Sequence, residues 1–432
     1  MRRSHMNIKL LKKIKWALML MAAILLFGTY HAQAAIQGVA GNSFNMTAKT
    51  GYINTPDGNS IFMWGYALNN GIMQYPGPTM IVNQGAVVTV TLTNSLTVPV
   101  SIVFPGQNSV TAIGGAPGLI TQEAPPGGTV TYMFTASQPG TYTYYSGSSP
   151  ELQIEMGLVG ALIVRPSTSP TNQAYNHPDS QFEHEYLFLL SEIDPEIHTL
   201  VELGFMSQID NSTYWPVYWF INGRAAPDTM FDANVPWLPN QPYNCMPMMH
   251  PGERILIRMI GAGRDAHPLH THGNHHLVIA RDGRLLTGIS GADLSETLFT
   301  STVIPGGTAD AIYTWTGEYL GWDFYGHTPR SPLALNECPN GLADPGCDHG
   351  KPFPVILPNQ QDLTFGMFYS GSPLLGSLGK LPPGEGGFNP NGGFMFMWHS
   401  HNEKEITNND IFPGGLLTMM IVEHPSVTLV NP

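Results

Sequence analysis

The chain is assembled from short segments in which apolar and polar side chains alternate, and few folds are open to a polypeptide of this kind. Residues 86–94 (AVVTVTLTN) show the alternation of a strand that buries one face. Turn residues separate such segments, since glycine and proline supply 47 and 37 of the 432 residues. Only 11% of residues are charged, which disfavours long helices rich in Glu and Lys. We therefore predict an all-β protein made of antiparallel sandwiches or barrels.

The strand-like segments fall into two blocks, which we interpret as two domains. We predict a first domain over residues 35–166, a linker rich in Pro, Ser, Thr and Asn over 167–180, and a second domain over 181–432. Residues 316–394 of the second domain are dense in proline and glycine. A loop of this length inside a compact domain usually has a function, so we expect an insertion that caps the functional region of this domain.

Residues 1–34 have the layout of a secretory signal peptide. A basic start is followed by an apolar run over residues 16–27, and Ala32 and Ala34 give the A-x-A pattern of a cleavage site. The alternative is a retained membrane anchor, but the apolar run is shorter than the roughly 20 residues that a spanning helix needs. We expect the mature chain to begin at Ala35, to have no membrane insertion after signal cleavage, and to be periplasmic or extracellular.

Charge and cysteine content narrow the class of partner. The chain has 18 basic residues, of which six precede residue 35, and 31 acidic residues, so the mature chain would carry a formal charge of −19. Nucleic acids and anionic membrane surfaces are therefore not expected as partners. In an oxidising compartment we expect a disulfide between Cys338 and Cys347. Cys245 is then either a small buried apolar residue or a metal ligand beside Met248 and His250.

Two short stretches carry histidines at a spacing of two residues. Residues 267–276 (HPLHTHGNHH) hold five histidines, including His270 and His272, and residues 399–401 (HSH) hold two more. On a strand, side chains two residues apart point to the same face. If the two strands are neighbours, four imidazoles can surround one ion, and such a ligand set suits copper, zinc or iron rather than calcium or magnesium. The alternative for each pair is an ordinary surface position.

These motifs resemble those of the multicopper oxidase family. Residues 267–273 match the family pattern H-P-x-H-x-H-G in full, residues 138–142 (QPGTY) and 157–164 (GLVGALIV) match strands around another copper motif, and residues 398–401 (WHSH) stand where the family has H-C-H. The resemblance covers nearly all of the mature chain and is similar in layout to two-domain laccases and copper nitrite reductases. It implies two cupredoxin-like Greek-key domains and copper as the cofactor.

The resemblance also assigns a role to each histidine of the motifs. It makes His267 a ligand of the blue type 1 copper, His270 a ligand of the type 2 copper, and His272, His399 and His401 ligands of type 3 copper. All five are therefore candidate metal ligands.

Other positions depart from the family pattern. Ser400 stands where the family has the cysteine that binds type 1 copper, and Glu405 stands where the next histidine of that site would be. A blue copper site without thiolate is not expected. In the first domain, residues 103–106 (VFPG) replace H-x-H-G and residues 145–147 (YSG) replace H-S-H. Half of the ligands of a trinuclear copper cluster are thus missing.

Three hypotheses follow for the function. The first is a secreted protein that binds one copper ion through four histidines, with a further side chain nearby. The four are His270, His272, His399 and His401, and the nearby residue is His267, His275 or Glu405. The second is a copper oxidase whose cluster is completed by another chain, a cupredoxin partner with intact H-x-H-G and H-S-H motifs. Apart from this hypothesis, a homo-oligomer is a possible state of the protein, a trimer by analogy. The third is a degenerate family member with a structural or interaction role. The usual laccase mechanism is not expected in a single chain.

Overall fold

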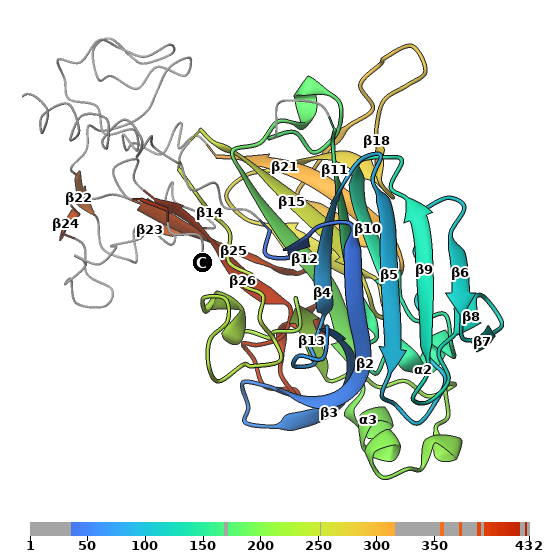
Figure 1. Cartoon of the computed structure of the whole chain (residues 1–432). Coiled ribbons are helices and arrows are strands. Elements are labelled where there is room, and N and C mark those ends of the chain that lie inside the picture. The colour runs from blue at the N-terminus through green and yellow to red at the C-terminus, as the bar shows by residue number, and fades with distance from the viewer. Residues whose placement is uncertain are drawn as a thin grey trace, which may run out of the picture. The chain divides into compact units, whose positions relative to one another are not determined.

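The computed structural model describes residues 36–167, 172–250, 252–315, 355–357, 371–373, 387–389, 393–423 and 428–429. The predicted signal peptide, the predicted disulfide between Cys338 and Cys347 and most of the predicted insertion at 316–394 lie outside these residues. Within the described part, strands dominate and helices are short (Figure 1), so the all-β prediction is confirmed. None of the helices in that part is long and apolar enough to cross a membrane.

The first sandwich is built from residues 39–165, whose strands form two main sheets around one core. One sheet has the order β1 (Val39–Ala40), β4 (Gly77–Asn83), β11 (Val159–Arg165) and β10 (Gly140–Tyr145). The other has the order β3 (Ser60–Leu68), β2 (Ser43–Asn54), β5 (Val87–Asn94), β9 (Thr129–Thr135) and β6 (Thr111–Gly114), and a separate ribbon joins β7 (Ala116–Pro117) to β8 (Gln122–Glu123). Val88, Val90 and Leu92 of β5 are buried in the core, as the alternation in the sequence predicts.

The second sandwich again has two main sheets, which face each other across a core that includes Phe188, Ile257, Leu269 and Trp398. The larger sheet has the order β13 (Tyr218–Ile221), β12 (His184–Ile193), β15 (Arg254–Gly261), β21 (Thr308–Thr314), β17 (His276–Arg281) and β18 (Arg284–Leu285), with β19 (Glu296–Leu298) paired to β17. The smaller sheet has the order β14 (Met248–Met249), β26 (Leu417–Glu423), β25 (Gly393–Ser400), β16 (His267–Thr271) and β20 (Thr300–Val303), with β23 (Gly371–Pro373) paired to β25. A separate ribbon joins β22 (Val355–Leu357) to β24 (Gly387–Asn389).

The helices are brief connections between strands. They are α2 (Pro150–Gln153), α3 (Pro195–Glu202) and the 3-10 turns η1 (Pro178–Ser180), η2 (Met206–Gln208), η3 (Asp228–Met230) and η5 (Glu403–Ile406). The Asp194 carboxylate caps α3 by accepting the backbone N–H of Glu196 at 3.0 Å. Ile197 and Val201 of α3 join the core of the first sandwich although α3 follows β12 in the chain. The domain boundaries at 166 and 181 therefore stay a prediction.

The two sandwiches share a buried contact along β12, all of whose residues are buried. One apolar cluster joins residues of β11 to Leu187 and Leu189 of β12. Beside it, the fully buried Arg258 lies between two carboxylates, with Nε 3.1 Å from Glu185 and Nη1 3.7 Å from Asp310. Thr141 of the first sandwich donates a hydrogen bond to Asp310 at 2.5 Å. The charged groups at this contact are thus paired, as buried charges require, although Nη2 of Arg258 has no hydrogen-bond partner.

We predict that Asp310→Asn destabilises the fold by about 3 kcal/mol, near the lower end of the range for breaking a buried ion pair, because Arg258 keeps Glu185 as a partner. The amide nitrogen would also face groups that already donate hydrogen bonds to this position. Denaturant unfolding measures the loss. Glu296→Gln is the control, since its pair with Arg281 is exposed and its removal is expected to cost less than about 1 kcal/mol. Equal effects of the two variants would contradict the prediction.

Candidate metal centre

Two neighbouring strands bring the paired histidines together. β16 and β25 run antiparallel, and in their register His270 lies opposite His399. His272 follows the end of β16 by one residue, and His401 follows the end of β25 by one residue. The two H-x-H segments are therefore neighbours, and His272 and His401 extend from the central His270–His399 pair in opposite directions along the two strands, with the backbone N–H of His272 donating to Met397 and that of His401 donating to Pro268.

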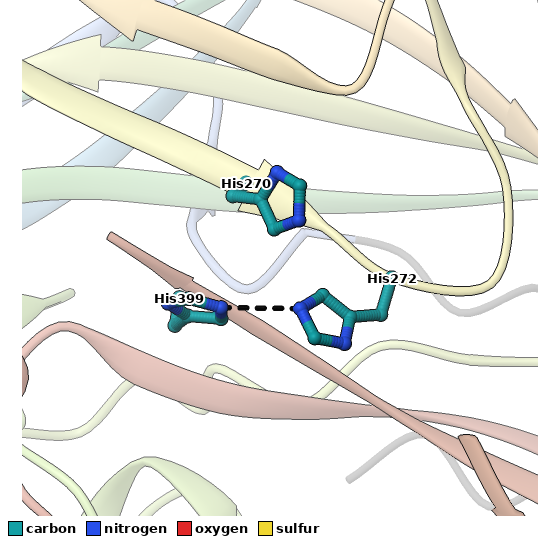
Figure 2. Close-up of side chains that lie close together, drawn as sticks. All are labelled: His270, His272 and His399. Carbon is teal, nitrogen blue, oxygen red and sulfur yellow. Dashed lines mark hydrogen bonds between the residues drawn. The ribbon is translucent and has the colours of Figure 1, made fainter. Parts of the chain in front are cut away.

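Three of the four imidazoles converge. The ligand atoms of His270, His272 and His399 all lie within 4.8 Å of one another, and Nε2 of His272 lies 3.2 Å from Nε2 of His399 (Figure 2). His399 donates its Nδ1 hydrogen to the carbonyl of Ser400 at 2.6 Å, and Nδ1 of His270 lies 2.8 Å from the Thr300 hydroxyl. Metal-binding histidines are commonly oriented through their second nitrogen in this way.

His401 lies at the border of this group. Its ring centroid is 4.8 Å from that of His270 and 5.7 Å from that of His399. The side chain is 54% exposed, and Nδ1 is 3.9 Å from the carboxylate of Glu403. His401 therefore lies on the solvent side of the three converging rings and can approach an ion held by them.

The other histidines of residues 267–276 have different surroundings. His276 is buried, with its ring nitrogens 3.0 Å from the Thr271 hydroxyl and 2.7 Å from the Ser301 hydroxyl. His275 is exposed, and its ring packs against Phe299. The dense run of histidines therefore splits, and only His270 and His272 turn to the group formed with His399.

His267, also predicted as a ligand, lies apart in a buried ion triad. Its Nε2 is 2.9 Å from Glu192 and its Nδ1 is 3.0 Å from Glu405, so both ring nitrogens are bonded to carboxylates. Burial acts to lower the pKa of His267, but the hydrogen bonds to the two carboxylates outweigh it and raise the pKa to about 9. We assign His267 as an imidazolium, which has no lone pair for a metal.

The pKa values of two converging imidazoles are shifted in the opposite direction, downward. Burial, followed by the neighbouring histidines, lowers the pKa of His270 to about 4. Burial also lowers the pKa of His399. These two rings are thus neutral near pH 7, which is the form that binds transition metals.

Comparisons with known proteins identify the relatives of this fold. A family model described as multicopper oxidase matches residues 55–169. Laccase-2 of Cryptococcus neoformans is 27% identical over 255 residues, which cover 57% of this chain and 40% of that protein. Copper resistance protein A of Pseudomonas syringae is 35% identical over 98 residues, which cover 23% and 15%. The chain thus carries a multicopper oxidase match over residues 55–169 and is similar to members of that family over a larger part of its length.

Solved structures of family members have the same fold. A blue copper oxidase from Nitrosomonas europaea matches with a TM-score of 0.55 at 20% identity, covering 88% of this chain and 85% of that one. The multicopper oxidase mgLAC matches with a TM-score of 0.55 at 19% identity, covering 90% and 87%. By contrast, the match spans less than half the length of the curated relatives named above. The predicted cupredoxin-type fold and the resemblance to the multicopper oxidase family are confirmed, and the relatives support copper as the cofactor.

The donors present fit a copper site made of imidazoles better than the thiolate-bound type 1 copper of multicopper oxidases. Neutral imidazoles that converge within 4.8 Å form a nitrogen ligand set suited to a copper ion. At the position of the type 1 site, Ser400 is fully buried, and its hydroxyl accepts the backbone N–H of Asn402 at 3.1 Å. Together with the paired state of His267, this donor set does not fit a thiolate-bound copper.

The first sandwich offers no imidazole at the corresponding motif positions. Val103 and Tyr145 are joined there by backbone hydrogen bonds, and the buried hydroxyl of Ser146 donates to the side chain of Gln153 at 2.6 Å. Methyl groups, hydroxyls and amides of this kind are not copper ligands of the multicopper oxidase type.

Sequence reasoning missed Glu192 and Thr300 and left Cys245 open. Glu192 stands near the end of an apolar run (YLFLLSEI, residues 186–193), and a carboxylate in such a strand is the signal that a buried partner exists. Cys245 is buried and donates to the carbonyl of Ile221 at 2.9 Å. Burial raises the pKa of its thiol to about 12, so it is protonated, as expected for a small apolar residue.

We predict that the stability of this protein falls as pH rises from about 6.5 to 9 because of His267. Its pKa of about 9 in the folded state lies above the unfolded value of about 6.5, so its contribution is complete below the lower pH and is lost above the higher one. The loss is on the order of 3 kcal/mol. Denaturant unfolding at several pH values tests this, with His267→Asn as the variant in which the slope should flatten. An unchanged slope in that variant would contradict the prediction.

Proposed function

We propose that this member of the multicopper oxidase family is a secreted protein that binds a copper ion through His270, His272, His399 and His401, and that it lacks type 1 copper and half of the trinuclear ligands. The observation that carries the proposal is the convergence of three imidazole ligand atoms within 4.8 Å of one another. Bound copper would supply a redox-active ion that alternates between its cuprous and cupric states.

The ligand chemistry favours copper over the other metals that imidazole binds. For a given nitrogen site, affinity among divalent first-row metals is greatest for Cu²⁺. Carboxylates, which magnesium, calcium and manganese prefer, are not part of the converging group. Family membership points to the same metal.

The chain's own residues prepare the site for the ion. The hydrogen bond to the Ser400 carbonyl leaves Nε2 of His399 as the ligand nitrogen, and Thr300 orients His270. The low pKa of His270 keeps that ring unprotonated down to about pH 4. His401, half exposed at the border, would complete the shell from the solvent side or leave one position open to a small ligand.

The proposed role is copper binding rather than four-electron reduction of oxygen. That reaction in the family uses a type 1 copper to receive electrons, and Ser400 and the His267 triad stand at its position. It also uses histidines of the first domain, where this chain has Val103–Gly106 and Tyr145–Gly147 motifs without histidine. A periplasmic or extracellular location follows from the leader-like residues 1–34 and is part of the same proposal.

Copper content tests the proposal directly. We expect purified protein to bind one copper ion per chain and the double variant His399→Ala, His401→Ala to lose it, because two of the four imidazoles are removed. Elemental mass spectrometry after equilibration with copper and desalting provides the measurement. His275→Ala is the matched control, since its ring packs on Phe299 outside the converging group, and it should keep full occupancy. Absence of copper in the wild type, or full occupancy in the double variant, would overturn the proposal.

The asymmetry of the ligand set favours a second candidate function, that of a copper oxidase whose trinuclear cluster is completed by a partner chain. The second domain keeps its H-x-H pairs, whereas the first domain has none, so a partner chain with intact motifs would complete a trinuclear cluster. A homo-oligomer would not do so, because every copy lacks the same ligands. Purification from the native source tests this candidate: a second cupredoxin chain is expected in the complex, and a homo-oligomer without one would exclude it.

A further inference from the structure

We propose that Glu192, His267 and Glu405 form a positioning triad, which holds the two ligand-bearing segments of the histidine cluster in place without a metal ion. The triad occupies the position where the family resemblance puts type 1 copper. The effect of the triad on copper affinity rests on the function proposed above. Its effect on the position of the two segments does not.

The triad joins three separate elements in a dry environment. Glu192 comes from β12, His267 begins β16 and Glu405 lies in η5, and the exposed fractions of their side chains are 0%, 0% and 2%. The carboxylate oxygens that do not face His267 are also paired. Glu192 accepts the backbone N–H of Asp265 at 2.9 Å, and Glu405 accepts the side-chain amide of Asn402 at 3.0 Å. A buried charge network is tolerated when every member is satisfied in this way.

The packing around Glu192 leaves no room for a side chain at position 263. A Cβ at position 263 would lie 1.8 Å from one Glu192 oxygen and 2.4 Å from the other, so only glycine fits there. The backbone N–H of the next residue, Arg264, also donates to Glu192. The chain turns closely around this carboxylate, which fixes the charge that His267 meets.

Both segments that carry copper ligands are attached to the triad. His267 precedes His270 by three residues on β16, and Glu405 follows His401 by four. The backbone N–H of His401 donates to the carbonyl of Pro268, the neighbour of His267, at 2.8 Å. Asn402 connects the same loop to Glu405. Loss of the Glu405 charge should therefore loosen residues 400–405 against β16.

Glu405→Gln tests the role with a side chain of equal shape. Asp310→Asn is the matched control, because Asp310 is equally buried and paired with a cation but belongs to the Arg258 network. Hydrogen exchange of peptides that cover residues 396–406 is measured in the copper-free protein, and copper affinity is measured by competition with a chelator. We expect faster exchange in this segment only in Glu405→Gln, and a copper affinity lower by about 10-fold or more, the usual effect of removing a group that orients metal ligands.

The exchange measurement does not depend on copper binding. Equal exchange of residues 396–406 in Glu405→Gln and the wild type would overturn the positioning role, whether or not copper binds. Faster exchange in both variants would overturn it too, since a general loss of stability would then explain the effect. If exchange rises only in Glu405→Gln while the wild type binds no copper, the triad holds the segments but the proposed function fails. Asn402→Ala, which leaves the ion pairs intact, should give an intermediate increase.

Discussion

The antiparallel register of β16 against β25 is the interaction on which the candidate metal centre depends. It places His270 opposite His399, and the next histidine of each segment, His272 or His401, follows just beyond the C-terminal end of its own strand. Because side chains alternate along a strand, a shift of the register by one residue would turn one histidine of each pair away from the other. The core beneath β25, with Trp398 fully buried beside Tyr313 and Phe188, fixes that register by packing.

The second sandwich holds histidines in two different protonation states. Burial, together with neighbouring histidines, lowers the pKa of His270 and of His399, so both rings are neutral near pH 7 and available to a metal ion. His267, only three residues from His270, is held between two carboxylates and is charged. The same residue type thus has opposite protonation states within one motif, and the difference comes from Glu192 and Glu405. At the position where the family resemblance puts a thiolate and a copper ion, this chain has these two carboxylates.

Much of this could be predicted from the sequence because it depends on local periodicity. The alternation in residues 86–94 marks the buried face of β5, and the two-residue spacing of the histidines indicates a shared face on two strands. The environment of His267 could not be predicted in this way. Its partner Glu192 is 75 residues away on β12, and only the packing of the two sheets against each other brings them together. Likewise, His401 stands two residues from His399, as His272 stands two residues from His270. The exposure of His401, however, depends on the loop that leads to η5.

We propose that imidazoles alone hold the copper ion, without a thiolate. The electron paramagnetic resonance spectrum of the copper-loaded protein distinguishes these two kinds of ligand. We predict a cupric signal with hyperfine coupling to at least three imidazole nitrogens and no strong blue absorbance. A blue thiolate–copper spectrum, or a cupric signal without imidazole nitrogen coupling, would show that the ligands are not these imidazoles.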